Sequence, residues 1–257
     1  MKNILAYVNE LLDKKSMDLD EFKSLLLKEY NNSQLVDIII KKGLIEKNLD
    51  ISNNTINLVN KFDYEEDKSE VSLCFSIPPF EKVALETILK TKRIGFMTIE
   101  DCFKFLIRSA KKIIKISSPF FEMSGWKKIE REMIAYLKSG GKLEVLVRGK
   151  EMQAEEETLG SKRRSADIRR ILSNLEKLGL ANQVKFREYH YGDKRIRSST
   201  HAKLFISDGS SAYIGSGEVR KNSFDINFEM GVLIKGDLVT DIDKVFDFMV
   251  ESSNELK

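Results

Sequence analysis

The stretch from His201 to Glu218 has residue types and spacings suited to chemistry on a phosphate group. Its sequence, HAKLFISDGSSAYIGSGE, satisfies the pattern H-x-K-x4-D-x6-G-S, and the motif positions are His201, Lys203, Asp208, Gly215 and Ser216. Residues two apart on a strand project from the same face, so His201 and Lys203 offer a nucleophile and a fixed cation to one phosphate. After the predicted hairpin, Gly215 and Ser216 could bring backbone N–H groups and a hydroxyl to the same anion.

A carboxylate downstream of this motif completes the arrangement. Glu229 follows Ser216 by thirteen residues, inside NFEMGVLI. It could accept a hydrogen bond from the second imidazole nitrogen of His201, which would fix the tautomer and raise the basicity of the attacking nitrogen. For H-x-K alone, the alternative is a core strand with a hydrogen-bonded histidine and a snorkelling lysine. The full pattern together with Glu229 favours the functional interpretation.

The motif resembles the HKD motif of the phospholipase D superfamily, and Glu229 stands where that family carries a glutamate. The resemblance implies an α/β fold, a phospholipase D-like layered domain with a mixed sheet between helices. It implies a phosphodiesterase that uses no metal and no other cofactor and works through a covalent phosphohistidine. The catalytic residues it implies are His201, Lys203, Asp208, Ser216 and Glu229. Over residues 100–250 the chain is also similar to the phospholipase D-like component of the DISARM antiphage system.

One position departs from the family pattern. The family usually has Asn two residues after the motif serine, and this chain has Glu218 there. A carboxylate aimed at a phosphodiester would repel it by roughly a kcal/mol or more in a partly desolvated site. One possibility is that Glu218 turns away to pair with Arg220 or Lys221, which leaves Asn222 or Asn227 to hold the phosphate. The other is a weakened or specialised site.

The chain has only one further histidine, and this bears on the mechanism. One imidazole must attack phosphorus while a second protonates the leaving oxygen. His190 has no lysine two residues after it, and YHYGDKRIR is a poor second copy of the motif, so a structural role or a rim contact is expected for His190. The resemblance implies a homodimer in which two copies of His201 and Lys203 form one site.

Two basic clusters flank the motif in the sequence and favour a nucleic-acid substrate, DNA or RNA. They consist of Lys162, Arg163, Arg164, Arg169 and Arg170, and of Lys194, Arg195 and Arg197. The predicted substrate-binding residues are Gly215, Glu218, Asn227, Lys194, Arg195 and Arg197. The alternative for the clusters is a solvated charged face, because residues 155–157 are acidic. For the protein as a whole, the alternatives are a phospholipase D acting on lipid and a non-catalytic nucleic-acid-binding or assembly subunit of a defence or repair system.

The composition excludes a uniformly basic protein that coats nucleic acid, because the 257 residues include 40 Asp and Glu beside 43 Lys and Arg. Any anionic partner must therefore be held by local clusters. Cys74 and Cys102 have neither metal-ligand spacing nor further cysteines to form a disulfide framework, which favours free thiols in a reducing compartment. The N-terminus lacks the pattern of a signal peptide, and no apolar run approaches the roughly 20 residues needed to cross a bilayer. A cytoplasmic protein without membrane contacts is expected.

The hydrophobic pattern predicts two regions that position these residues. Residues 1–70 are expected to form a small helical N-terminal region, either winged-helix-like or a helical cap, that ends in the polar linker 63–70. Residues 71–257 are expected to form the catalytic domain, in which strands alternate with helices. Its predicted strands are 71–77, 112–121, 142–149, 183–190, 201–208, 211–216 and 227–236, and its predicted helices are 81–92, 98–111, 126–138, 165–178 and 239–250.

Overall fold

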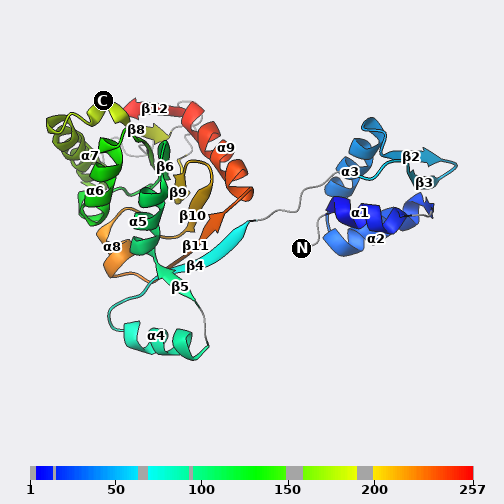
Figure 1. Ribbon diagram of the computed structural model, residues 1–257, viewed down its shortest axis with the longest axis horizontal. Coiled ribbons are helices and arrows are strands. Elements are labelled where there is room, and N and C mark those ends of the chain that lie inside the picture. Colours follow the sequence, from blue (N-terminus) through cyan, green and yellow to red (C-terminus); the bar gives the residue numbers. More distant parts are fainter. Residues whose placement is uncertain are drawn as a thin grey trace. The chain divides into compact units, whose positions relative to one another are not determined.

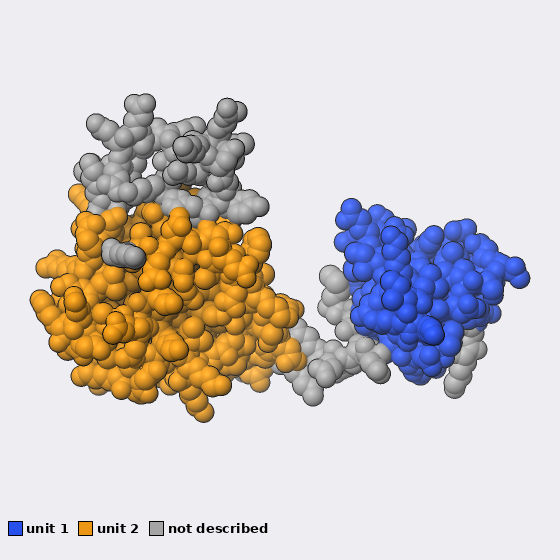
Figure 2. Space-filling model, turned by 90° about the horizontal axis from the view of Figure 1, so that it is seen from above, with its two compact units in different colours: residues 1–66 blue, residues 67–257 orange. Residues whose placement is uncertain are grey.

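The computed structural model describes residues 4–13, 16–62, 69–92, 95–148, 159–189 and 199–256. The chain divides into two compact units, Met1–Glu66 and Asp67–Lys257 (Figure 2). This division falls inside the stretch 63–70, whose polar composition had marked it as a linker. Each unit has a separate hydrophobic core.

The first unit is mixed α/β rather than purely helical. Its elements are α1 (Ile4–Leu12), β1 (Met17–Asp18), α2 (Leu19–Tyr30), α3 (Ser33–Ile45), β2 (Leu49–Ser52) and β3 (Thr55–Leu58). The strands form an antiparallel sheet in the order β1-β3-β2. Helix α2 begins where the Asp18 carboxylate accepts the N–H groups of Asp20 and Glu21, and Asn32 caps α3 in the same way. The unit therefore combines helices with a small sheet in the order helix–strand–helix–helix–strand–strand, and the winged-helix-like alternative stays a prediction.

The second unit is built on a nine-stranded mixed sheet in the order β12-β8-β7-β6-β9-β10-β11-β4-β5. The strands are β4 (Glu70–Ser76), β5 (Phe96–Thr98), β6 (Ile113–Ser117), β7 (Lys142–Arg148), β8 (Val184–Tyr189), β9 (Leu204–Ser207), β10 (Ser211–Gly215), β11 (Glu229–Lys235) and β12 (Ser253–Leu256). The helices are α4 (Lys82–Thr91), α5 (Ile99–Ser109), α6 (Met123–Lys138), α7 (Leu159–Lys177), α8 (Lys221–Asp225), α9 (Leu238–Glu251) and the short η1 (Ala181–Gln183). The edge strands β5 and β12 are additions that the sequence pattern did not predict.

Helices cover both faces of this sheet, which confirms the predicted layered α/β fold (Figure 1). Helices α5, α6, α7 and α8 pack on one face around Trp126, Phe205 and Tyr213. Helix α9 packs on the other face over Ile206 and Ile234. No helix in the described part of the chain is long and apolar enough to cross a bilayer.

At one edge of the sheet, formed by the ends of strands rather than by an outermost strand, six strands begin or end. Strands β6 and β7 are parallel, whereas β9, β10, β11 and β4 follow one another antiparallel. As a result the last residues of β6, β10 and β4 lie beside the first residues of β9 and β11, with Ser117 opposite Leu204 and Ser76 opposite Glu229. Arg148 ends β7 at the same edge. This edge carries most of the predicted site.

Candidate active site

His201 and Lys203 lie at this edge, immediately before β9 rather than within it. Leu204 is the first residue of the ladder. The backbone of the intervening Ala202 is held by side chains instead: its N–H donates to Oγ1 of Thr200 at 3.2 Å, and its carbonyl accepts from Oγ of Ser117 at 2.9 Å. The correction to the predicted strand is therefore small, because these bonds keep the segment beside the end of β6.

The His201 imidazole and the Lys203 ammonium are adjacent, as their spacing predicted. Nζ of Lys203 lies 3.1 Å from Nδ1 and 3.3 Å from Nε2 of His201, and it donates to the His201 carbonyl at 2.9 Å. The His201 residue is exposed, whereas the Lys203 side chain is only 11% exposed. The edge therefore presents an accessible imidazole backed by a nearly buried cation, an arrangement suited to nucleophilic attack on an anionic phosphodiester.

Gly215 and Ser216 lie at the end of β10, beside the first residues of β11. A Cβ atom on Gly215 would lie 2.6 Å from the Cα of Gly231, so glycine is required for the strands to approach. Oγ of Ser216 accepts the Met230 N–H at 3.1 Å. Ser216 is exposed, and in this structure its hydroxyl extends the β10–β11 pairing.

Glu229 is buried at the start of β11 with partners other than His201. Its Oε1 accepts from Oγ of Ser223 at 3.1 Å and from Nδ2 of Asn227 at 3.0 Å. The bonds found for the His201 ring among the described residues come from Lys203. Asn227 thus supports Glu229, and the predicted direct contact between Glu229 and His201 is not formed in this structure.

Glu218 is the clearest departure from expectation. It is 5% exposed, and its Oε1 lies 3.2 Å from Nζ of Lys203. Its Oε2 accepts the Phe120 N–H at 2.7 Å. Of the two possibilities left open, pairing of Glu218 with Arg220 or Lys221 is not the one found, because Arg220 pairs instead with Glu122 at 3.3 Å. The carboxylate therefore faces into the site.

Asp208, the remaining motif residue, does not reach the site. It lies in the turn between β9 and β10 with φ of 52°, and its carboxylate accepts the N–H groups of Lys111, Lys112 and Ile113 at 2.6–2.9 Å. Ile113 begins β6, whereas the site lies where β6 ends. Burial would raise the pKa of Asp208, but these three donors outweigh it and hold the pKa below its usual range. Asp208 fixes the turn rather than contacting substrate.

Three residues that the sequence analysis did not assign to substrate complete the rim of the site. The Phe120 ring lies edge-on to the His201 ring, with centroids 6.5 Å apart. The guanidinium groups of Arg148 and Arg220 lie 5.7 Å and 5.6 Å from the Phe120 ring centroid. Strand β6 ends at Ser117, earlier than the predicted strand 112–121, and the approach of Arg148 and Arg220 follows only from the order of the strands.

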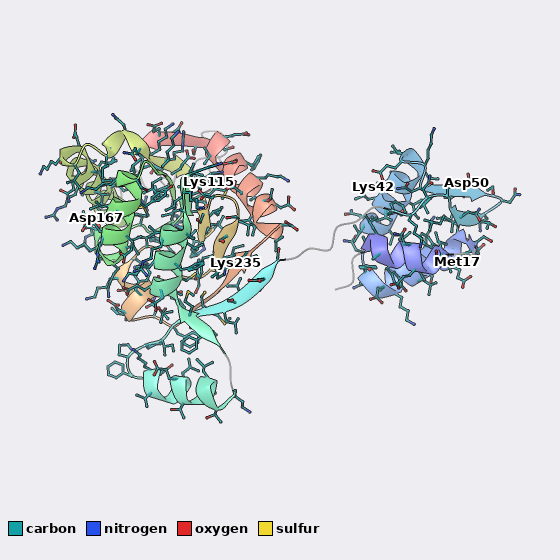
Figure 3. The ribbon with its side chains drawn as sticks, viewed as in Figure 1. Met17, Lys42, Asp50, Lys115, Asp167 and Lys235 are labelled. Carbon is teal, nitrogen blue, oxygen red and sulfur yellow. The ribbon has the colours of Figure 1, made fainter. Side chains whose placement is uncertain are left out.

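A groove of about 610 Å³ continues from Phe120 along α6 and α7. Its cationic lining residues are Lys127, Arg163, Arg164, Arg170 and Arg220, and its anionic ones are Glu122 and Asp167. Asp167 on α7 accepts the Met123 N–H at 2.9 Å, which joins α7 to the start of α6 (Figure 3). The first predicted basic cluster therefore contributes to a groove that begins at the edge carrying His201 and Lys203.

Several predicted residues lie outside the described part of the chain. They are His190, Lys194, Arg195 and Arg197, so their predicted roles stay predictions. Within the residues that the structure describes, no group of three or more His, Cys, Asp or Glu side chains is arranged to hold a metal ion.

Comparisons with known proteins give one family and several distant structural likenesses. The family model described as "Cardiolipin synthase, PLD-like domain" matches residues 104–250. NucT from Helicobacter pylori is 16% identical with a TM-score of 0.47, over 73% of this chain and 100% of that one. Nuc, a phospholipase D family member from Salmonella typhimurium, is 14% identical with a TM-score of 0.48, over 74% and 99%.

A larger protein also shares the fold. Phosphatidylserine synthase from Haemophilus influenzae is 14% identical with a TM-score of 0.51, over 88% of this chain. The match covers 48% of the synthase chain, so the present chain spans about half its length. No curated protein matches the sequence.

Proposed function

The chain belongs to the phospholipase D-like family, whose model spans more than half of it, and we propose that it is a metal-independent phosphodiesterase that cleaves nucleic acid. The observation that carries this proposal is the contact between Lys203 and His201 at an exposed sheet edge. An imidazole nitrogen attacks phosphorus while the lysine neutralises the phosphoryl oxygens. The P–N bond forms as the bond to the leaving oxygen breaks. Water then attacks phosphorus, the P–N bond breaks, and the imidazole is regenerated.

A second imidazole is needed to protonate the leaving oxygen and then to deprotonate the attacking water. The proposal assigns this role to His201 of a second copy, because the chain has only two histidines and His190 has no lysine two residues after it. Exposed apolar side chains at the catalytic edge support such pairing. Phe228 and Met230 flank Glu229 and are 50% and 56% exposed.

The helix that follows β4 adds to this apolar surface. Strand β4 ends at Ser76 beside Glu229, and α4 stands off from the sheet beyond β5 (Figure 1). Phe80 and Val83, at the start of this excursion, are 101% and 77% exposed. Burying them against a second copy would remove a large apolar surface from water at the place where a second imidazole is required.

A polynucleotide is favoured over a lipid by the charge beside the site. The groove beyond Phe120 has five cationic and two anionic lining side chains. Residues 67–257 carry 34 Lys and Arg against 28 Asp and Glu, whereas residues 1–66 carry 9 against 12. The excess positive charge therefore lies in the unit with the catalytic edge, where consecutive phosphates would be neutralised. The Phe120 ring offers a surface on which a base could stack.

The test uses the full chain with single-stranded DNA, double-stranded DNA, RNA and phosphatidylcholine vesicles, each in EDTA. Cleavage of a nucleic acid in EDTA that is lost in His201→Ala supports the proposal. Binding without cleavage points to a non-catalytic module, and release of a phosphatidyl product points to a lipase. Either of these two results contradicts the proposed nuclease.

A further inference from the structure

Glu218 pairs with the Lys203 ammonium, which is the cation that a substrate phosphate would contact in the proposed mechanism. We infer that this carboxylate is an internal competitor for Lys203, so that it sets how strongly the site binds phosphate and which substrates fill the site at a given concentration, namely polyanions rather than small phosphate esters. The inference rests on the proposed function and concerns regulation of the same site. It follows from the partners of Lys203, from the way Glu218 is held, and from the charge around it.

Each of the three Lys203 donors has a partner within the chain. An ammonium group has three N–H donors and no acceptor. Nζ of Lys203 lies 2.9 Å from the His201 carbonyl, 3.1 Å from Nδ1 of His201 and 3.2 Å from Oε1 of Glu218. A phosphate that approaches Lys203 must therefore displace one of these partners. Glu218 is the partner of like charge to the phosphate, so it is the one that opposes binding.

The Glu218 side chain is fixed by the protein rather than placed by chance on a surface. Its Oε2 accepts the Phe120 N–H at 2.7 Å, and the side chain is 6% exposed. The neighbouring backbone is also held, because the Val219 N–H donates to Oγ of Ser118 at 3.1 Å. A Cβ atom on Gly125 would lie 2.2 Å from the backbone nitrogen of Arg220, so α6 packs directly against the backbone that follows Glu218. The backbone on which Glu218 sits is therefore fixed, and its carboxylate cannot leave the site without breaking its hydrogen bond to the Phe120 N–H.

This arrangement distinguishes a lone phosphate from a phosphate in a polymer. A small phosphodiester has only its own contacts with which to displace Glu218 from Lys203. A polynucleotide also binds cations in the groove beyond Phe120, among them Lys127, Arg163 and Arg170. The free energy of those contacts offsets the cost of displacing Glu218, so a polynucleotide fills the site at concentrations at which a small diester does not. Glu218 therefore sets a threshold of affinity that long substrates exceed and small ones do not.

The experiment measures binding of inorganic phosphate by isothermal titration calorimetry to the wild-type chain, Glu218→Gln and Glu218→Asn. Gln keeps an oxygen for the Phe120 N–H and removes the charge, so phosphate is expected to bind about tenfold tighter or more. KM for bis(4-nitrophenyl) phosphate should fall by a similar factor, so that this small diester fills the site at concentrations at which it does not fill the wild-type site. The matched control is Glu132→Gln, which removes a 13% exposed carboxylate paired with Arg108 at 2.7 Å on α6. This control should bind phosphate like the wild type.

Equal or weaker phosphate binding in both folded Glu218 variants would overturn the inference, because it would make the carboxylate a support for Lys203. Circular dichroism and Tm show whether each variant is folded, and Asn serves if Gln is not. Phosphate binding does not require hydrolysis, so the two proposals fail separately. Tighter binding in Glu218→Gln with no cleavage of any nucleic acid would support the competitor role and contradict the nuclease. Cleavage with unchanged phosphate affinity would do the reverse.

Discussion

Asp208 and His201 lie at opposite ends of β6, although one short motif contains both. Asp208 accepts the backbone N–H of Ile113, where β6 begins, and the residue after His201 is held by Oγ of Ser117, where β6 ends. The motif therefore encodes two things at once. His201 and Lys203 form the reactive edge. Asp208 holds the turn at the other end of β9, which lies between Lys203 and Asp208 in the sequence.

Asp208→Asn should destabilise the second unit without removing its chemistry. The substitution places an NH2 group against at least one of the backbone N–H groups of Lys111, Lys112 and Ile113. Leaving such a donor unsatisfied costs about 1–3 kcal/mol. Chemical denaturation should show this loss, and kcat of the folded variant should stay within about threefold of the wild type. A loss of kcat as large as that of His201→Ala, with full stability, would place Asp208 in the chemistry.

The stability lost in Asp208→Asn should depend on pH, because the Asp208 carboxylate is titratable. The pKa of Asp208 is lowered in the folded state, so its contribution to stability is fully present above the unfolded value of about 3.9. This contribution disappears as the pH falls through the folded pKa. The difference in unfolding free energy between wild type and Asp208→Asn should therefore be constant near neutral pH and shrink below about pH 4. Urea denaturation at a series of pH values measures it.

Lys115 anchors α9 to the sheet, and its removal should be costly. Its Nζ lies 2.8 Å from Asp243 and 2.7 Å from Asp247, with the side chain 10% exposed (Figure 3). Burial lowers the pKa of Lys115, but the two carboxylates outweigh it and raise the pKa. Its stabilisation should accordingly persist to high pH and be lost as the pH rises through the folded value.

Lys115→Ala should cost about 1–3 kcal/mol, because it leaves the partly buried Asp243 without its cation, whereas the Asp247 side chain is 55% exposed and contributes little. The matched control is Lys244→Ala on α9, whose pair with Asp241 is 72% exposed on both sides and should contribute within about 0.5 kcal/mol. Thermal or urea unfolding distinguishes the two. Equal losses in the two variants would show that Lys115 does not hold the helix.

The groove cations should affect long substrates alone. In the double variant Arg163→Ala, Arg170→Ala, the affinity for an oligonucleotide should fall, and the slope of log K against log salt should decrease by about 1.4–1.8. Hydrolysis of bis(4-nitrophenyl) phosphate should be unchanged. The control Arg131→Ala, Lys138→Ala removes two exposed cations that do not line the groove. If the salt slope of the double variant equals that of the wild type, the groove does not contact the substrate.

A shared site predicts the outcome of mixing two chains. If each site needs His201 from both copies, a wild-type subunit paired with His201→Ala is inactive. After unfolding and refolding with a threefold excess of the variant, activity per wild-type subunit should fall to about a quarter. Activity that stays proportional to wild-type subunits, or full activity in a strict monomer, would contradict the two-subunit site.

The sequence predicted the parts of the site that depend on local spacing. The adjacency of His201 and Lys203 follows from a separation of two residues along an extended segment, and the alternation of strands and helices indicated the layered sheet. The predicted strand 201–208 likewise places Asp208 at the far end from His201, because seven residues of extended chain separate them. The catalytic role expected for Asp208 came from the motif resemblance, and the spacing did not show that its carboxylate would accept the N–H groups at the start of β6.

The remaining contacts depend on which strands become neighbours. Phe120 follows β6 and Arg148 ends β7, so their approach to His201 requires the parallel β6–β7 pair and the antiparallel β6–β9 pair together. The pairing of Glu218 with Lys203 was unpredictable for a related reason. Arg220 was nearer in sequence, but the fold directs it over Phe120 toward Glu122.

The central claim is that His201 forms a covalent bond to phosphorus. The most direct measurement is a reaction with a substrate nucleic acid in EDTA, stopped rapidly with a denaturant at neutral or alkaline pH, followed by proteolysis and mass spectrometry of the peptide that contains His201. The account predicts a phosphoryl or nucleotidyl adduct on His201 that is absent from His201→Ala. Turnover without any adduct on His201, or with the adduct on another residue, would contradict it.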